Sequence, residues 1–449
     1  MRKFLILIFI VTLAACSSSD DNGLVSPPLG ECSNTAQKQF VLDSMRTWYL
    51  WNDRLPAQVD LEGFDSPEEL LAFLTTFSPD GSSGEPIDAE RGFSFISLAE
   101  DEQQFFGEGR FEGYGFNSRF VATNDLRLAR VFEDSPAFRG GLRRGQRILE
   151  LNDRSIADIE AQEGVSAVFD TTPIKFRMLE TDGTTEFTVT IEQDVVTIDP
   201  VPGNWRVIDA AGGRKVGYME LASFISTADA QMDQVFAEFR NQNVNDVILD
   251  LRYNGGGLVN TAELLGDLLG GFDNDGRVFS ETLFNADRSA ANDDIEFFEA
   301  RGNSVSLVNL VVIASPNTAS ASELVTNSMD PWVAGGVSIV GDTTFGKPVG
   351  QIGLEFCEKI LRPTAFQTVN AAGFGDYFDG LTLDCAAADD LNVATGDDAD
   401  PNVIAALSIL EGTGCPTAVT TAAELAAQKA AVPAVKLRGP PHREFANAY

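Results

Sequence analysis

The pattern of apolar and polar residues changes twice along the chain. Over residues 35–77, apolar and aromatic residues recur at helical spacing, and Ser66-Pro67-Glu68-Glu69 is typical of a helix start. Over residues 107–192, short apolar runs between turn residues predict strands of a small β domain. From residue 215 onward, strand-like runs alternate with a helix-like run. These patterns predict a multidomain α+β protein with a small helical N-terminal domain and an α/β core.

The most regular part of the pattern lies after residue 215. A helix is predicted over 227–241, and strands are predicted at 215–221, 246–251, 307–313 and 337–340. The run at 246–251 is almost entirely apolar, which is typical of a strand buried on both faces of a sheet. In contrast, residues 78–90 are polar and rich in glycine and serine, so a loop is predicted there.

The first residues carry the features of an export signal. A basic start precedes an apolar run over residues 4–15, which is too short to cross a bilayer as a helix. The run ends in Leu-Ala-Ala before Cys16, and serines and aspartates follow, which resembles a bacterial lipobox. This resemblance implies cleavage before Cys16 and attachment of lipid, which anchors the protein to a membrane. An ordinary cleaved signal with an incidental cysteine is the alternative.

The export signal determines the expected location and the first domain boundaries. We expect a signal peptide over 1–15, a flexible tether over 16–32 and the helical domain over 33–106. The protein is then expected in the bacterial cell envelope, facing the periplasm. Ser17, rather than an aspartate, follows Cys16 and favours the outer membrane over the inner membrane.

Charge and histidine content narrow the chemistry. The chain has 67 acidic and 32 basic residues, a net charge of −35, and such a surface repels phosphate backbones, so nucleic acid is not an expected partner. The single histidine, His442, lies in the tail, whereas a Ser-His-Asp triad needs an imidazole in a packed site. Neither CxxC nor HExxH occurs, so no metal or other cofactor is expected.

Four cysteines remain after Cys16, and an even number in an oxidising compartment suggests disulfides. Three pairings are possible. Cys357 and Cys385 lie in one C-terminal segment, which favours a bond between them and leaves Cys32 with Cys415.

Three short segments of the α/β part carry candidate chemistry. The first, Asn254-Gly255-Gly256-Gly257, follows a buried strand, and its bare backbone suits an oxyanion hole or a tight structural turn. The second contains Ser320, which follows the strand at 307–313 and precedes a helix-like run, a place that exposes a serine at a helix N-terminus. Ser320 and Glu323 also form Ser-x-x-Glu, so a helix-capping box is the alternative.

The third segment contains a lysine. Lys347 lies in Thr-Phe-Gly-Lys-Pro-Val-Gly-Gln, just after the strand at 337–340. Desolvation in a short apolar loop lowers the pKa of a lysine and lets it act as a general base. A lysine on the surface is the alternative, because lysines are rarely buried.

The predicted β domain carries its own motif. Ser135-Pro136 opens a short helix that leads through a glycine turn to a strand, and Gly113-Tyr114-Gly115-Phe116 lies upstream. These segments resemble a PDZ domain over 107–195. The resemblance implies that backbone N–H groups of Gly113, Tyr114, Gly115 and Phe116 bind the terminal carboxylate of a peptide that adds as a strand. A small β domain without a ligand is the alternative.

The order of these segments resembles that of the carboxy-terminal processing, or tail-specific, serine proteases. The PDZ-like stretch is followed by Asp-Leu-Arg-x-Asn-Gly-Gly-Gly, then by Thr-Ala-Ser-Ala-Ser-Glu, and last by Thr-Phe-Gly-Lys-x-x-x-Gln. The resemblance implies a catalytic domain over 196–415 with the ββα superhelix of crotonases and Clp proteases, followed by an alanine-rich tail over 416–449. It implies Ser320 as the nucleophile, Lys347 as the base and Gln351 as the residue that orients this base. It implies an oxyanion hole formed by the N–H groups of Ala321 and of Gly255 or Gly256.

The spacing departs from the family pattern in one respect. Ser320 and Lys347 are 27 positions apart, two more than we expect of the family, whereas Ser322 and Lys347 are 25 apart, so Ser322 stays the second candidate nucleophile. The resemblance implies an endopeptidase that selects protein or peptide substrates by their exposed C-termini and cleaves through an acyl-enzyme. A non-catalytic PDZ-bearing envelope adaptor and a ligand-binding protein on the same fold are the alternatives.

Overall fold

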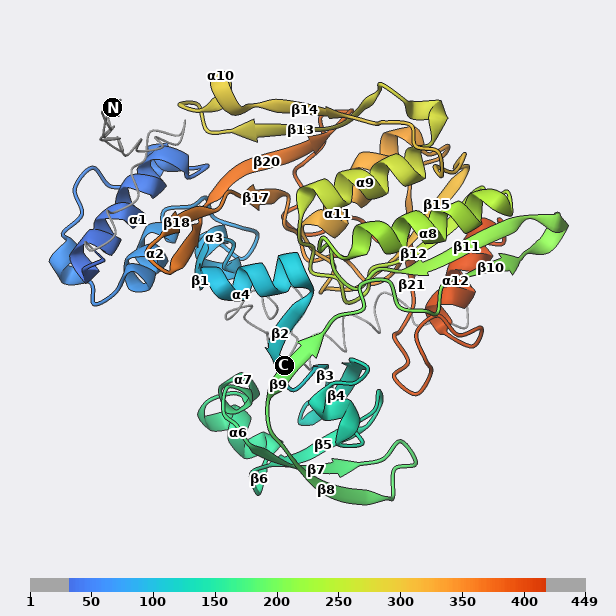
Figure 1. Ribbon diagram of the computed structural model, residues 1–449, viewed down its shortest axis with the longest axis horizontal. Helices are drawn as coiled ribbons and strands as arrows, with labels where there is room; N and C mark the ends of the chain where they lie inside the picture. Colours follow the sequence, from blue (N-terminus) through green and yellow to red (C-terminus); the bar gives the residue numbers. More distant parts are fainter. Residues whose placement is uncertain (1–31, 417–449) are drawn as a thin grey trace, which may run out of the picture.

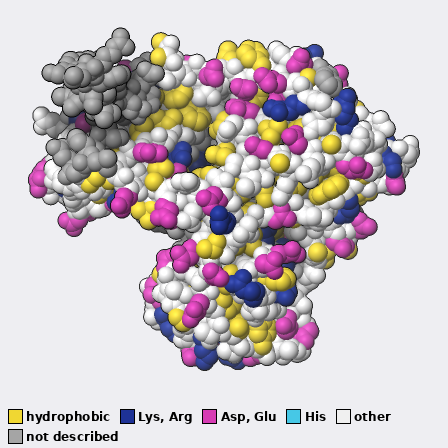
Figure 2. Space-filling model, in the orientation of Figure 1, with side chains coloured by type: hydrophobic (Ala, Val, Ile, Leu, Met, Phe, Trp, Pro, Cys, Tyr) yellow, Lys and Arg dark blue, Asp and Glu magenta, His cyan; other side chains and the backbone are white. Residues whose placement is uncertain are grey.

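The structure is a computed structural model that describes residues 32–416. The predicted signal peptide and Cys16 lie outside the described residues, as does His442 in the tail. Figure 1 shows a larger body and, below it, a smaller module (residues 107–195) that is joined to the body by two strands. No helix within residues 32–416 is long and apolar enough to cross a membrane. On the face drawn in Figure 2, acidic side chains are spread over the whole surface rather than gathered in one patch.

A six-stranded sheet lies at the centre of the larger body. Its strands follow the order β10 (Arg206–Asp209), β11 (Lys215–Glu220), β12 (Asp246–Asp250), β15 (Asn309–Ala314), β16 (Ser338–Gly341) and β21 (Cys385–Ala386). The strands from β11 to β21 are parallel, and β10 is antiparallel to β11. The four strands predicted from apolar runs are confirmed, with ends that differ by no more than two residues.

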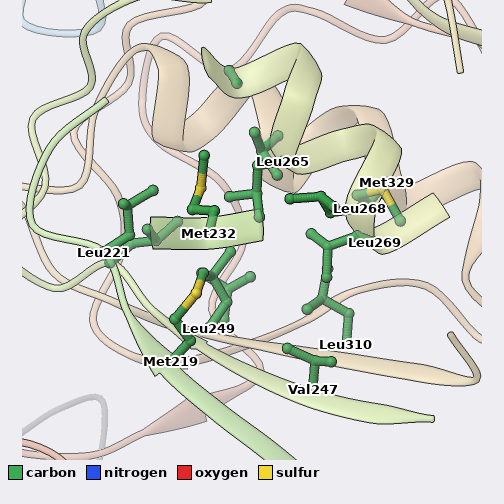
Figure 3. Close-up of a cluster of buried hydrophobic side chains, with 14 of the residues drawn as sticks. Met219, Leu221, Met232, Val247, Leu249, Leu265, Leu268, Leu269, Leu310 and Met329 are labelled. Carbon is green, nitrogen blue, oxygen red and sulfur yellow. The ribbon is translucent and has the colours of Figure 1, made fainter. Parts of the chain in front are cut away.

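Helices cover both faces of this sheet. α8 (Ala228–Asn241), α9 (Val259–Gly270) and α11 (Ala321–Met329) pack on one face, in the same buried cluster as Val247 and Leu249 of β12 (Figure 3). α12 (Pro401–Leu410) packs on the other face, in the same cluster as Ile248. Because side chains alternate between the two faces of a strand, β12 is apolar at every interior position. The predicted α/β layers and the helix at 227–241 are confirmed.

The N-terminal part contains helices and also a strand. α1 (Asn34–Trp48), α2 (Pro67–Thr75), α3 (Ile87–Arg91), β1 (Phe95–Leu98) and α4 (Ala99–Glu102) follow one another. β1 pairs with β19 (Lys359–Arg362), and β19 pairs with β18 (Leu354–Phe356). Phe40 of α1 stacks on Phe356, with ring centroids 4.9 Å apart. The helical N-terminal domain expected over 33–106 therefore also contains a strand, and it shares a sheet and a core with a segment that is distant in sequence.

A second sheet connects the N-terminal part to the central sheet. Its strands follow the order β14 (Asp294–Phe297), β13 (Val278–Phe284), β20 (Thr364–Asn370) and β17 (Val349–Gln351), and a short helix, α10 (Ser289–Asn292), joins β13 to β14. All its neighbouring strands are antiparallel. The segment with Lys347 runs from β16 of the central sheet to β17 of this sheet, so a strand holds each of its ends.

The module is a small β domain, as predicted. Its sheet contains β3 (Phe116–Ala122), β4 (Asp125–Val131), β5 (Arg147–Leu151), β7 (Ile174–Leu179) and β8 (Glu186–Ile191), and β6 (Arg154–Ser155) pairs with β5. The short helices α5 (Pro136–Arg139), α6 (Ile156–Gln162) and α7 (Val165–Phe169) complete it. β2 (Arg110–Gly113) and β9 (Asp194–Thr197) pair as an antiparallel ribbon that leads to the larger body (Figure 1). β3 lies at the edge of the module sheet.

The disulfides differ from the favoured pairing. Cys32 is bonded to Cys357, and Cys385 is bonded to Cys415. Cys357 lies between β18 and β19, which pack against α1, whereas Cys385 lies on β21, against the sheet face that α12 covers. The predicted pairing of Cys357 with Cys385 is therefore wrong, because the two residues belong to different sheets although they are close in sequence.

Candidate active site

Ser320 lies at the junction between β15 and α11, as the sequence predicted. Its φ of 53° is in the left-handed region, which is uncommon for residues other than glycine and marks a strained turn. Its backbone N–H donates to Glu323 Oε2 at 3.0 Å, and its carbonyl accepts the N–H of Leu324 at 2.8 Å. The side chain is half-buried, so the serine is placed at a helix N-terminus with access to solvent.

The second candidate serine has a different environment. Ser322 is fully buried, and its hydroxyl donates to the carbonyl of Asn254 at 2.9 Å. This hydrogen bond ties α11 to the glycine turn that follows β12. The structure therefore gives Ser322 a partner in the core and leaves Ser320 as the partly exposed serine of the motif.

The glycine turn packs directly on the serine turn. Gly256 has a φ of 107°, and a Cβ there would lie 2.8 Å from Ser320 Cβ and 2.9 Å from Ala321 N, which excludes a side chain. The N–H of Gly256 donates to Asn254 Oδ1 at 2.9 Å. Within residues 32–416, no hydrogen bond uses the backbone N–H of Gly255 or of Ala321.

The lysine is buried, so the surface alternative is wrong. Lys347 is 8% exposed, and its Nζ lies 6.0 Å from the ring centroid of Phe93. Phe93 belongs to a cluster with Val349 and Phe345 from both sides of the lysine. Gln351 donates from Nε2 to the carbonyl of Phe93 at 2.7 Å. The residue expected to orient the base and the base itself thus both lie beside Phe93, a residue of the N-terminal part.

Asp88 on α3 is a further buried carboxylate in this part of the molecule, and the sequence pattern did not indicate it. Asp88 is fully buried; its Oδ1 accepts the N–H of Ser94 at 2.7 Å, and its Oδ2 accepts the Ser94 hydroxyl at 2.6 Å. Burial raises the pKa of Asp88, while the hydrogen bonds from Ser94 and the charge of Lys347 act in the opposite direction. The composition of residues 78–90 predicted a polar loop and contained no sign that one aspartate is buried where the charge of Lys347 acts on it.

Glu323 joins the serine turn to the lysine segment. Its Oε2 accepts the N–H groups of Ser320 at 3.0 Å and Lys347 at 2.8 Å. Its Oε1 accepts the Thr344 hydroxyl at 2.6 Å and the N–H of Gly346 at 2.7 Å. Burial raises the pKa of Glu323 to about 7, although all four hydrogen bonds favour the carboxylate. The capping-box alternative explained the bond to Ser320, but not the contacts with the lysine segment.

The glycine loop expected to bind peptides lies inside the module. Tyr114 and Phe116 are fully buried in the module core. The carbonyls of Tyr114 and Gly115 accept the N–H groups of Ala137 at 2.9 Å and Phe132 at 3.0 Å. The loop, which runs from Gly113 to Phe116, leads directly into the edge strand β3, and its role in binding a peptide stays a prediction.

Comparisons with known proteins agree with this arrangement. The model of peptidase family S41 matches residues 215–374, and the model of the peptidase S41 N-terminal domain matches residues 36–95. The chain is 30% identical over 250 residues to the chloroplastic carboxyl-terminal-processing peptidase 3 of Arabidopsis thaliana, a match that covers 54% of this chain and 46% of that protein. It is 26% identical over 314 residues to the carboxyl-terminal-processing protease of Synechocystis sp., which covers 67% of this chain and 66% of that protein.

A solved structure has the same fold. The putative S41 protease of Bacteroides fragilis superposes with a TM-score of 0.63 at 23% sequence identity, over 83% of this chain and 97% of that chain. The chain spans between about half and two thirds of the length of the two curated relatives. The resemblance to the carboxy-terminal processing proteases is confirmed at the level of the family. Through its N-terminal domain and its peptidase domain, the chain matches peptidase family S41, and this match supports a serine-type peptidase.

Proposed function

We propose that the chain is a serine endopeptidase that works with a Ser320–Lys347 pair, without a histidine. The observation that carries this proposal is the carboxylate of Glu323, which binds the backbone of both residues and so holds the serine turn and the lysine segment together. A buried lysine and a partly exposed serine at a helix N-terminus, whose backbone N–H groups share one carboxylate, have the chemistry of an activated nucleophile.

In the proposed mechanism, Ser320 Oγ attacks the carbonyl carbon of the scissile peptide while Lys347 Nζ accepts the hydroxyl proton. The lysine then gives that proton to the leaving amine, and an acyl-enzyme remains, which water hydrolyses with the same lysine as base. The amine must be neutral to accept a proton, and burial favours the neutral form. Gln351, fixed on Phe93, orients the lysine.

The oxyanion of the tetrahedral intermediate needs two N–H donors. We assign these to Ala321 and Gly255, because the N–H of Gly256 already donates to Asn254. Gly256 contributes by its lack of a side chain, which lets the glycine turn approach Ser320.

The finer fold assignments are also proposals. The succession β10–β11–α8 and the later junction of β15 with α11 support a ββα superhelix of the crotonase and Clp-protease type. The glycine loop, which leads into β3, and the place of β3 as the outer strand of the module sheet support a PDZ domain that takes up a peptide C-terminus as an added strand. The substrates are then proteins or peptides with exposed C-termini.

Blocking the substrate C-terminus should weaken its recruitment. An unfolded polypeptide with a free terminal carboxylate is expected to be cleaved with a KM lower by roughly tenfold or more than its C-terminally amidated form, since hydrogen bonds to a charged group are worth about 1.5–3 kcal/mol. The two substrates have the same internal sequence, so kcat is expected to be the same for both. Steady-state kinetics on the two forms make the comparison. Equal KM values would contradict recruitment by the C-terminus, whereas no cleavage of either form would contradict the peptidase.

The buried carboxylate of Glu323 gives a second test. In Glu323→Gln the amide has one acceptor oxygen, and its NH2 group faces two of the four donors. Each buried donor without an acceptor costs about 1–3 kcal/mol, so cleavage is expected to slow by roughly 10- to 100-fold. Single-turnover rates measure this loss, and the exposed Glu411→Gln serves as the matched control.

The same variant should change the pH dependence of stability. Folding raises the pKa of Glu323 from 4.5 to about 7, so its ionisation disfavours the folded state. The protonated carboxyl group of Glu323 therefore contributes to the free energy of unfolding. This stabilisation is fully present below about pH 4.5 and is lost as the pH rises through about 7. Thermal unfolding between these pH values should show the loss in the wild type and in Glu411→Gln. If Glu323→Gln kept the same slope, another group would be responsible.

We propose that the protein is attached by lipid at Cys16 to the bacterial envelope, more specifically to the periplasmic face of the outer membrane. Leu-Ala-Ala before this cysteine and the serines after it support the assignment. A Cys16→Ala variant that still sediments with membranes would contradict it.

A further inference from the structure

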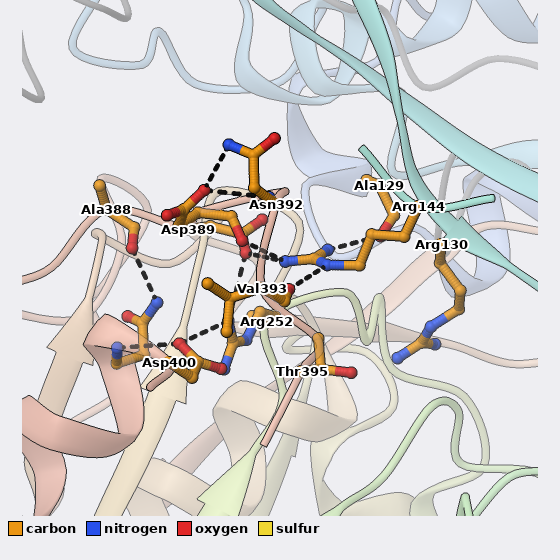
Figure 4. A network of polar contacts seen from close by, with 12 residues as sticks. Ala129, Arg130, Arg144, Arg252, Ala388, Asp389, Asn392, Val393, Thr395 and Asp400 are labelled. Atoms are coloured by element: carbon orange, nitrogen blue, oxygen red, sulfur yellow. Dashed lines mark hydrogen bonds and ion pairs between the residues drawn. The ribbon is translucent and has the colours of Figure 1, made fainter. Parts of the chain in front are cut away.

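The acidic segment near the C-terminus contacts both the module and the catalytic core. Residues 388–400, here called the docking segment, lie between β21 and α12. The side chain of Asp389 is 11% exposed and is the centre of the polar network in Figure 4. Neither the serine–lysine mechanism nor the peptide-binding loop uses this segment.

Two arginines of the module bind the docking segment. Arg144 donates from Nη2 to Asp389 Oδ1 at 2.6 Å and from Nε to the carbonyl of Val393 at 2.9 Å. Arg119 donates from Nη2 to the carbonyl of Asp389 at 2.6 Å and lies 3.3 Å from its Oδ2. Between them, Leu391 packs with Ala129 of the module. The contact therefore combines ion pairs with buried apolar surface.

The same carboxylate binds the end of the catalytic strand β12. Arg252 donates from Nη1 to Asp389 Oδ1 at 3.2 Å, and the Tyr253 hydroxyl donates to Asp389 Oδ2. Arg144 also donates to the Tyr253 hydroxyl at 2.6 Å, so the module and the segment after β12 contact each other directly. Asp389 thus joins two arginines of the module to two consecutive residues of the core.

These two core residues lead straight into the glycine turn. Asn254 follows Tyr253; its Oδ1 accepts the N–H of Gly256, and its carbonyl accepts the Ser322 hydroxyl of α11. Tyr253 is buried, and its ring lies 5.2 Å from the guanidinium carbon of Arg130, a further residue of the module. A displacement of Arg252 and Tyr253 would therefore move the turn that carries the Gly255 N–H.

We propose that Asp389 is a positioning residue for the reaction: by binding Arg252 and Tyr253 together with the arginines of the module, it couples the docked position of the module to the geometry of the oxyanion turn. This inference rests on the proposed function for its effect on rate. It gives the acidic segment a role, and it predicts that a loosened module slows the chemical step as well as recruitment.

The local charges make this inference testable without loss of the fold. Arg252 keeps two other carboxylates, Asp250 at 2.7 Å and Asp400 at 2.7 Å, when Asp389 loses its charge. Arg144 and Arg119, in contrast, each form an ion pair with Asp389 and with no other carboxylate among residues 32–416. Asp389→Asn should therefore loosen the module, which keeps the ion pair of Arg130 with Glu220, while the central sheet stays folded.

The experiment compares two substrates. One is an unfolded polypeptide with a free C-terminus, and the other is a short amidated peptide that bypasses the module. We expect Asp389→Asn to lower kcat on both by roughly 10- to 100-fold, as a small misplacement of catalytic groups does, and Asp389→Glu to restore part of it. Asp398→Asn, whose carboxylate in the same segment is 91% exposed, should behave as the wild type. An unchanged kcat on the short peptide would overturn the coupling.

Hydrogen exchange gives a readout that does not depend on peptidase activity. In Asp389→Asn, the amides of residues 253–257 should exchange at least about tenfold faster than in the wild type, and those of β15 should not change. Unchanged exchange at the glycine turn would overturn the inference even if the chain cleaved neither substrate. Faster exchange with an inactive wild type would reject the proposed function and keep the coupling.

Discussion

Ser320→Ala is expected to abolish cleavage, while Ser322→Ala keeps a measurable rate. Without the Ser320 hydroxyl no acyl-enzyme can form, and loss of a serine nucleophile costs on the order of 10⁶ in kcat. Ser322 is fully buried and donates to the carbonyl of Asn254, so its removal takes away one buried hydrogen bond. That bond contributes about 1 kcal/mol to stability, and its loss should lower the midpoint of thermal unfolding rather than stop the reaction.

Two measurements on purified protein separate these effects. Single-turnover cleavage of an unfolded substrate reports on the nucleophile, and thermal unfolding reports on the buried hydrogen bond. If Ser322→Ala were inactive and fully folded while Ser320→Ala cleaved, the 25-residue spacing would be the better guide to the nucleophile. The strained φ of Ser320 would then need another explanation.

Lys347→Arg is expected to be as inactive as Lys347→Ala. The base must be neutral when it accepts the proton of Ser320, and a guanidinium stays charged at every working pH. The loss of a general base costs roughly 10²- to 10⁴-fold. In the wild type, kcat should rise with pH as the lysine amine loses its proton. The arginine variant separates a base from a simple positive charge, because it keeps the charge in the same buried segment beside Phe93.

Two controls accompany this variant. Lys359→Arg changes a lysine on β19 that pairs with Glu68 of α2, outside the proposed site, and should leave the rate unchanged. His442→Ala removes the single histidine of the chain and should also have no effect. Substantial cleavage by Lys347→Arg, or loss of cleavage in His442→Ala, would contradict the serine–lysine mechanism.

The central sheet could be predicted because its signal is local. β12 is buried on both faces, so its apolar run marks it without knowledge of its neighbours. The serine and lysine segments could be found for a similar reason, since each follows a strand and combines a reactive residue with glycine or a helix start. The order of these segments along the chain was sufficient to suggest the family that the comparisons support.

Partners across long stretches of chain could not be predicted in this way. β1 pairs with β19 more than 250 positions away, and Cys32 bonds to Cys357 at a separation of 325 residues. Periodicity indicates which face of an element is apolar, but many other apolar faces in the same chain would fit it equally well. The favoured disulfide pairing was wrong because it relied on proximity in sequence.

The sequence by itself indicated the candidate reactive residues of this protein, the strands and helices beside which they lie, and a site that does not depend on histidine. Only the tertiary structure decided what surrounds these groups: Phe93 beside the lysine, the bonds of Glu323 to the lysine segment, and Asp389 between the module and the core. The physical reason is that burial and charge pairing depend on which segments meet in space. The sequence alone does not show whether the carboxylate of an aspartate such as Asp389 is surrounded by water or, as here, by three arginines.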